Sequence, residues 1–152
     1  MAATPANAVI WLHGDHLSAD NPAMRAFPGA PVVFVFDEDF LRTLQFGFGR
    51  LAFIYESVMD VFAARAEGSC SVRRGVVLEE VIAFARDRGA TRIITTQTVG
   101  DRFAGYVAEL ENAGFTVRAL DVPELVAYPN AARAPKRFSA WWREVEGEAL
   151  AP

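Results

Sequence analysis

Two short runs of exclusively apolar residues constrain the fold of this chain more than any other feature. They are residues 8–12, AVIWL, and residues 32–36, VVFVF. Continuous runs of aliphatic, β-branched and aromatic residues of this length are typical of strands in a parallel sheet that is covered on both faces. We therefore expect both runs to be central strands.

Three further segments have strand character of other kinds. Residues 69–73 and 115–120 alternate polar with apolar side chains, the pattern of strands with one less fully covered face. We expect these two to be edge strands. Residues 92–96 have a pattern between the continuous apolar runs and the alternating segments, and they are predicted to complete the set of five strands.

Helical periods separate the strands. Apolar residues recur every three or four positions over 51–62, 78–85 and 103–110, which indicates amphipathic helices. Gly89 and Gly114 follow two of these segments, where a left-handed residue ends a helix at little cost. Alternating strands and helices imply parallel strands with right-handed crossovers. The predicted fold is α/β and Rossmann-like: a five-stranded parallel open sheet, order 3-2-1-4-5, with helices on both faces.

The composition indicates a single folded domain and excludes several classes of protein. The chain has 152 residues, of which 52% are hydrophobic and 22% charged, so it is not a disordered protein. We expect one domain over 1–152, with a core at about 7–126 and a tail at 127–152. No apolar run is long enough to span a membrane and the start lacks the pattern of a secretory signal, so we expect a cytoplasmic protein.

Charge and cysteine content narrow the possible partners. The net charge is −4, which disfavours direct binding of a polyanion such as nucleic acid. The single cysteine, Cys70, excludes an intramolecular disulfide and a multi-thiolate zinc site. Asp37, Glu38 and Asp39 follow the second strand, but neither they nor the histidines have the spacing of a strong metal signature. We expect no metal site, and expect these carboxylates to cap a helix.

The predicted strand order places a ligand site beyond the first and fourth strands. In open α/β sheets, ligands bind beyond the carboxyl ends of the strands where the order reverses. His13, Gly14, Asp15 and His16 directly follow the first strand and are the best candidates. The alternative is a loop in which Asp15 caps a turn and the histidines are solvated.

Two helix starts supply further candidates. Gly100, Asp101 and Arg102 follow the fourth strand and open a helix, whose N–H groups and arginine would hold an anionic or planar ligand. The alternative is that Asp101 caps the helix and Arg102 is solvated. Arg50 stands at the positive end of another helix, which suggests an anion nearby.

Five stretches of the chain match one family in the same order along the chain. They are 11–24, WLHGDHLSADNPAM; 50–58, RLAFIYESV; 72–75, VRRG; 89–91, GAT; and the aromatic segment 138–142, FSAWW. Together they resemble the amino-terminal α/β domain of the photolyase and cryptochrome family over nearly the whole chain. The run GDHLS at 14–18 is similar to the GDQLS opening of the iron-sulfur branch of photolyase-related proteins.

The chain also departs from the family. His13, Gly14 and Leu17 replace arginines of the family's first turn, and Val76 and Val77 replace the D-P that usually follows V-R-R-G. The large helical domain that binds the catalytic flavin and the DNA lesion in this family has no counterpart. The resemblance thus implies an accessory domain that does not itself repair DNA.

In this family the α/β domain can hold an antenna chromophore: a flavin, deazaflavin, lumazine or folate. Trp11, Phe36 and Phe53 are expected to line an apolar slot for such a flat ligand. The resemblance implies a cofactor-binding site formed by His13, Gly14, Asp15, His16, Asp37, Arg50, Gln97, Gly100, Asp101 and Arg102.

Three functions remain open at this stage. The first is the binding of a chromophore or nucleotide-like ligand without catalysis. The second is a small phosphotransfer or hydrolytic enzyme in which His13, His16 and Asp101 act on a nucleotide. The third is an interaction module whose tail, around Trp141 and Trp142, docks a helical flavin-binding partner or a second copy.

Overall fold

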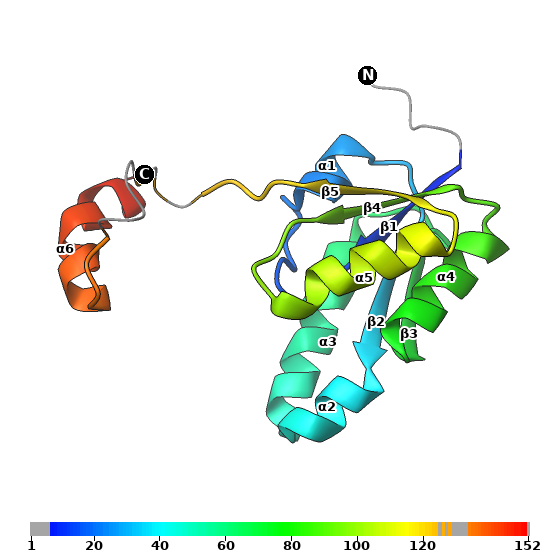
Figure 1. Ribbon diagram of the computed structural model, residues 1–152, viewed down its shortest axis with the longest axis horizontal. Helices are drawn as coiled ribbons and strands as arrows, with labels where there is room; N and C mark the ends of the chain where they lie inside the picture. Colours follow the sequence, from blue (N-terminus) through cyan, green and yellow to red (C-terminus); the bar gives the residue numbers. More distant parts are fainter. Residues whose placement is uncertain (1–6, 125, 127, 129–133, 152) are drawn as a thin grey trace. The chain divides into compact units, whose positions relative to one another are not determined.

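The computed structural model describes residues 7–124, 126, 128 and 134–151. Within them, five parallel strands form one sheet of order β3-β2-β1-β4-β5 (Figure 1). This confirms the predicted strand order, with the two apolar runs near the centre and the two alternating segments at the edges. The strands are β1 (Ala8–Leu12), β2 (Val32–Asp37), β3 (Cys70–Gly75), β4 (Arg92–Thr96) and β5 (Thr116–Leu120).

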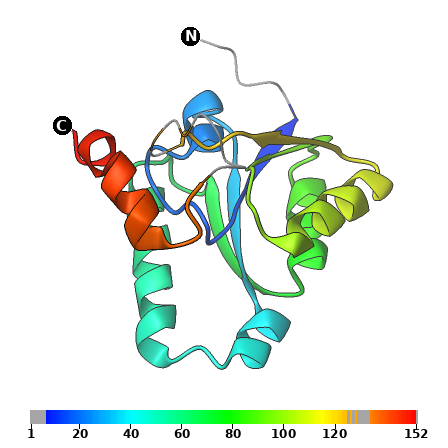
Figure 2. The same ribbon diagram turned by 60° about the vertical axis from the view of Figure 1, so that its left-hand side comes forward.

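The helices cover both faces of the sheet, as expected. Those next to the sheet are α1 (Pro22–Ala26), α3 (Phe48–Ala63), α4 (Val77–Asp87) and α5 (Asp101–Asn112), and α2 (Glu38–Leu44) directly follows β2. The turned view shows α3 and α5 on opposite sides of the strands (Figure 2). Alternate residues of β1 divide between the two faces. Ile10 and Leu12 belong to the core cluster with α1 and α3, whereas Val9 and Trp11 belong to the cluster with α4 and α5.

The strand register brings the carboxyl ends of three strands together. Ile10 of β1 pairs with Val32 of β2 on one side and with Ile94 of β4 on the other. Parallel strands in this register end at the same edge of the sheet. The loops after β1, β2 and β4 therefore meet at the point where the strand order reverses.

The helix ends carry local signals, of which the sequence predicted the carboxylate cap after β2 and the glycine after α5. The side chain of Asn21 caps α1, and Pro22 occupies the first helical turn. Asp37 caps α2 by accepting a hydrogen bond from the Phe40 N–H at 3.0 Å. Gly114 lies just beyond α5 with a φ of 95°, a backbone conformation that favours glycine.

The chain separates into two compact units, Met1–Val122 and Pro123–Pro152. Residues 125, 127 and 129–133, around the expected start of the tail, lie outside the described residues. The second unit contains α6 (Phe138–Ala149). Trp141 and Trp142 are both half-buried, and their rings lie 5.6 and 5.8 Å from that of Phe138, which is itself 71% exposed. No helix among the described residues is long and apolar enough to cross a membrane.

Candidate functional site

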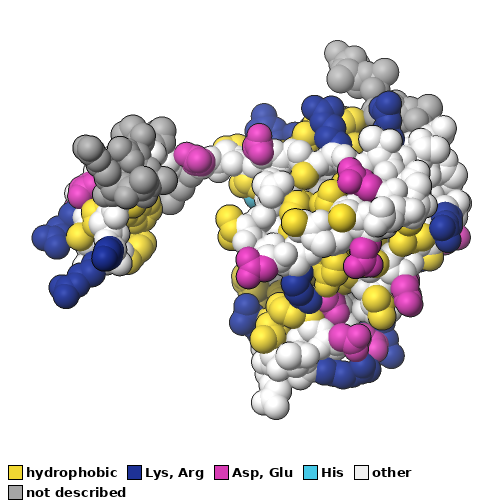
Figure 3. All heavy atoms as spheres, viewed as in Figure 1, with side chains coloured by type: hydrophobic (Ala, Val, Ile, Leu, Met, Phe, Trp, Pro, Cys, Tyr) yellow, Lys and Arg dark blue, Asp and Glu magenta, His cyan; other side chains and the backbone are white. Residues whose placement is uncertain are grey.

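A pocket of about 370 Å³ opens at the carboxyl ends of β1, β2 and β4. Figure 3 shows hydrophobic side chains interleaved with acidic and basic ones on this face of the molecule, over α5 and the region of α2. Aromatic and aliphatic residues dominate the pocket wall, and a few polar side chains lie among them. The lining residues are Trp11, His13, Gly14, Asp15, Phe34, Val35, Phe36, Asp37, Phe40, Leu41, Phe46, Ile54, Val77, Thr98, Gly100, Asp101, Arg102, Phe103 and Tyr106.

A polar cluster connects β2 with α5 inside this pocket. The Oδ2 of Asp37 accepts hydrogen bonds from Arg102 Nη1 at 3.2 Å and from the Tyr106 hydroxyl at 3.4 Å. The guanidinium of Arg102 lies 3.9 Å from the centre of the Phe40 ring, a cation–π distance. Burial raises the pKa of Tyr106, and the neighbouring Asp37 raises it further against the opposing effect of Arg102. The cluster thus fixes one planar cation against an aromatic wall.

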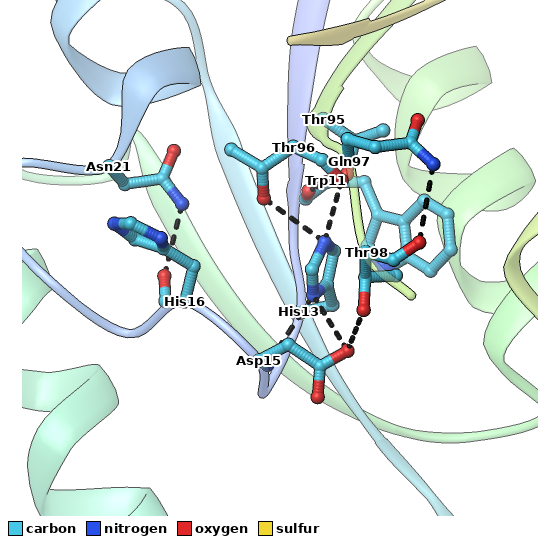
Figure 4. A network of polar contacts seen from close by, with 9 residues as sticks. All are labelled: Trp11, His13, Asp15, His16, Asn21, Thr95, Thr96, Gln97 and Thr98. Atoms are coloured by element: carbon cyan, nitrogen blue, oxygen red, sulfur yellow. Dashed lines mark hydrogen bonds and ion pairs between the residues drawn. The ribbon is translucent and has the colours of Figure 1, made fainter. Parts of the chain in front are cut away.

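His13 is held from one side by β4 (Figure 4). Its Nε2 lies 2.9 Å from the Thr96 carbonyl oxygen and 3.0 Å from the Thr96 hydroxyl. A carbonyl only accepts hydrogen bonds, so Nε2 carries the proton and Nδ1 is the acceptor in the neutral ring. Nδ1 accepts the backbone N–H of Asp15 at 3.4 Å, and the Thr98 hydroxyl donates to the Asp15 carboxylate.

The order of these groups does not form a nucleophilic triad. In a triad the imidazole contacts the nucleophilic hydroxyl, and the carboxylate lies on the far side of the ring. Here the Asp15 carboxylate lies between the Thr98 hydroxyl and His13, at 3.8 Å from Nδ1, so the ring cannot take the hydroxyl proton. Across the part of the chain that the structure describes, no group of three or more His, Cys, Asp or Glu side chains could hold a metal ion.

The pocket brings together most of the residues that the sequence singled out as ligand contacts. Those that line it are His13, Gly14, Asp15, Asp37, Gly100, Asp101 and Arg102. Their role in binding stays a prediction.

Three predicted contacts lie outside the pocket lining. The carbonyl of His16 accepts a hydrogen bond from Asn21, so this residue serves the turn before α1. Gln97 is exposed, and its side chain donates to the Thr98 carbonyl. Arg50 lies over the Phe46 ring at 4.2 Å, which gives its charge a partner other than the anion that we expected.

The apolar wall differs from the expected slot. Trp11 and Phe36 line the pocket as predicted, but Phe53 does not, because it lies on the outer side of α3 with 69% of its surface exposed. Phe40 and Tyr106 were missed as pocket residues. Tyr106 lies four positions after Arg102 on α5, and this spacing places two side chains on one helix face, a signal that could have found it.

Two comparisons relate the chain to known proteins. The model of the DNA photolyase family matches residues 8–152. The crystal structure of a bacterial class III photolyase from Agrobacterium tumefaciens matches with a TM-score of 0.66 and 17% identity. This match covers 97% of the chain and 33% of the photolyase, so the chain spans about a third of that protein's length. At this identity the match shows the shared fold.

A second solved structure, of the hypothetical protein PH0823, has a TM-score of 0.49 and 16% identity. This match covers 78% of the present chain and 98% of PH0823. No curated protein sequence matches the chain.

Proposed function

The chain belongs to the DNA photolyase family, and on this premise we propose that its α/β unit binds a flat, conjugated chromophore in the pocket beyond β1, β2 and β4. The bound chromophore would absorb light and pass the energy to a flavin held elsewhere. This role requires binding and orientation of the ligand, and no bond is made or broken by the unit itself.

The observation that carries the proposal is the aromatic wall of the pocket beside one fixed polar cluster. Pockets of roughly 300–1,000 Å³ with mostly apolar walls and a few oriented polar groups are typical of small-molecule sites. Trp11, Phe36, Phe40 and Phe46 supply ring surfaces from β1, β2, α2 and the loop that follows α2. A conjugated ring system buries more surface against such walls than an aliphatic ligand of equal size, and it also gains from stacking.

Arg102 is suited to orient that ring system. A guanidinium has five N–H donors, and the hydrogen bonds to Asp37 and Tyr106 both use Nη1. Arg102 lines the pocket, and among the described residues its Nε and Nη2 donors have no hydrogen-bond partner. We propose that they donate to carbonyl oxygens of the chromophore, while Phe40 keeps the guanidinium plane in place.

Ligand retention tests the proposal. The purified chain is incubated separately with riboflavin, a ribityl-lumazine, a deazaflavin and a reduced folate, then desalted and examined by absorption spectroscopy and native mass spectrometry. We expect one of these ligands to stay bound at one per chain. Replacing Arg102 with glutamine should weaken the binding about tenfold, the effect of losing one charge-assisted hydrogen bond.

The control for this variant is Arg86→Gln. Arg86 is an exposed residue near the end of α4 and does not line the pocket, so this change should leave the affinity unaltered. Retention of none of the four ligands would refute the proposal.

A second function, association through α6, is favoured by the aromatic cluster of the second unit. Phe138 is mostly exposed and stacks on Trp142, and Trp141 lies 6.3 Å from Trp142. We propose that this cluster meets a second copy or a helical flavin-binding partner. Changing both tryptophans to alanine should abolish concentration-dependent association in sedimentation experiments and leave the circular dichroism spectrum largely intact. Unfolding of the variant would instead place both tryptophans in a core.

A further inference from the structure

We propose that the ligand of this pocket carries no phosphate or other anionic group. The inference rests on the proposed function and narrows its ligand class. The inference follows from the charges of the pocket lining. The lining includes three carboxylates, those of Asp15, Asp37 and Asp101, and one guanidinium, that of Arg102. A site with this excess of negative charge repels an anion, and its carboxylates accept hydrogen bonds from donors on a ligand.

The single cation of the lining is already neutralised. Arg102 Nη1 lies 3.2 Å from Asp37 Oδ2, and only 15% of the Asp37 side chain is exposed. A phosphate could approach the Nε and Nη2 donors without breaking this pair, but it would then meet a cation whose charge the Asp37 carboxylate already offsets. Arg102 therefore keeps Asp37 as its partner and offers its other donors to neutral acceptors.

The two helix starts at the pocket are also compensated by the chain itself. Helix N-termini commonly bind phosphate because of their free N–H groups and positive dipole end. At α2, the Asp37 carboxylate accepts the Phe40 N–H, and Glu38 and Asp39 follow in the first turn. At α5, Asp101 stands in the first turn. Each helix start thus has its own negative charge where an anion would have to bind.

The two remaining carboxylates favour a polyol on the ligand. Asp101 is exposed, and 67% of the Asp15 side chain is accessible to solvent. Asp15 already accepts the Thr98 hydroxyl, which shows that it can hold an O–H donor. Hydroxyl groups of a ribityl chain can donate to such carboxylates, whereas a terminal phosphate, at about −1.5 to −2 charges, is repelled by them.

The experiment compares riboflavin with its 5′-phosphate, FMN, which differ only in the phosphate. Each is titrated into the full chain at about 0.01 M ionic strength, where the screening length is about 30 Å, and flavin fluorescence is measured. We expect riboflavin to bind at least about tenfold more tightly than FMN. At about 1 M salt, where the screening length is about 3 Å, the ratio should fall towards one.

Two variants assign the effect to the carboxylates. The double variant Asp15→Asn, Asp101→Asn should bring the affinities for FMN and riboflavin to within about threefold at low salt, because two repelling charges are removed. The matched control is Glu111→Gln, which removes one exposed charge from the last turn of the same helix, about 15 Å along the axis from Asp101. It should keep the tenfold preference.

The outcomes separate this inference from the proposed function. Equal or tighter binding of FMN by the unaltered chain would overturn the inference and leave a chromophore site in place. A preference for riboflavin that high salt and the double variant both leave unchanged would overturn it as well, since the preference would then not be electrostatic. Failure of both flavins, the ribityl-lumazine, the deazaflavin and the reduced folate to bind would overturn the inference together with the chromophore proposal, whereas retention of the folate alone, whose carboxylates are anionic, would overturn only the inference.

Discussion

Asp37 links the fold and the pocket through the two oxygens of one carboxylate. Oδ1 caps α2, and Oδ2 holds Arg102 and Tyr106. The local role was open to sequence analysis, because a carboxylate before a helix is a common cap. The contacts to α5 could not be predicted from the sequence. Asp37 and Arg102 are 65 residues apart, and only the folded sheet brings β2 and α5 together.

Asn21 is the residue whose replacement we expect to be most informative about the fold near the site. Its side chain is 1% exposed and makes three hydrogen bonds: it accepts the Ala23 and Met24 N–H groups and donates to the His16 carbonyl. Asn21→Ala removes the cap and leaves polar groups unpaired. We expect a loss of about 2 kcal/mol in the free energy of unfolding, measured by urea denaturation.

The neighbouring residue provides the control for this substitution. Asp20 is exposed, and it contributes its backbone N–H, not its carboxylate, to the bond with Ser18. Asp20→Ala should therefore change stability by no more than about 0.5 kcal/mol. Equal effects of the two substitutions would show that the buried amide of Asn21 is not what holds this turn.

At the scale of elements, the sequence predicted best where burial is complete. β1 and the first four residues of β2 are fully buried, so their residues are apolar without interruption and the pattern is unambiguous. The carboxylates after β2 predicted a helix start, but the extent of α2 was not predicted, because none of its residues is buried and it therefore has no apolar stripe to detect. It is supported by the Asp37 cap and by the Glu38–Arg42 ion pair at 2.9 Å, contacts that leave no periodic signal.

Two glycines, one inside α5 and one just beyond it, should respond to alanine in opposite directions. Gly114, just past the helix end, has a φ of 95°, which a side chain tolerates poorly, so Gly114→Ala should destabilise the protein by about 1–2 kcal/mol. Gly105 lies inside the helix, and a Cβ there would meet no atom within 4 Å. Gly105→Ala should stabilise the protein by about 0.5–1 kcal/mol. Thermal unfolding followed by circular dichroism distinguishes the two, and equal signs would contradict the assigned helix end.

At the scale of the whole molecule, topology was predictable and the pocket wall was not. Strand order followed from which strands are apolar throughout and which alternate, because the two patterns separate the sheet's centre from its edges. The wall depends on side-chain direction. Phe53 and Ile54 are adjacent on α3, yet Ile54 lines the pocket and Phe53 is exposed. Both are apolar, and only the spacing of Ile54 to the buried Val58 distinguishes them.

The separation into two units leads to the last prediction. Every residue of the two core clusters, and every residue that lines the pocket, belongs to Met1–Val122. A unit with its own core is expected to fold alone. The fragment 1–122 should therefore unfold cooperatively in urea, with a free energy of unfolding within about 1 kcal/mol of that of the full chain.

Ligand binding extends this prediction from the fold to the site. A ligand that binds only the folded state stabilises it by about 2.7 kcal/mol at 100 times its dissociation constant. If the pocket is complete within the first unit, the chromophore retained by the full chain should stabilise the fragment by the same amount. A fragment that unfolds cooperatively but gains nothing from the ligand would show that Pro123–Pro152 contributes to binding, and a fragment without a cooperative transition would show that the first unit does not fold alone.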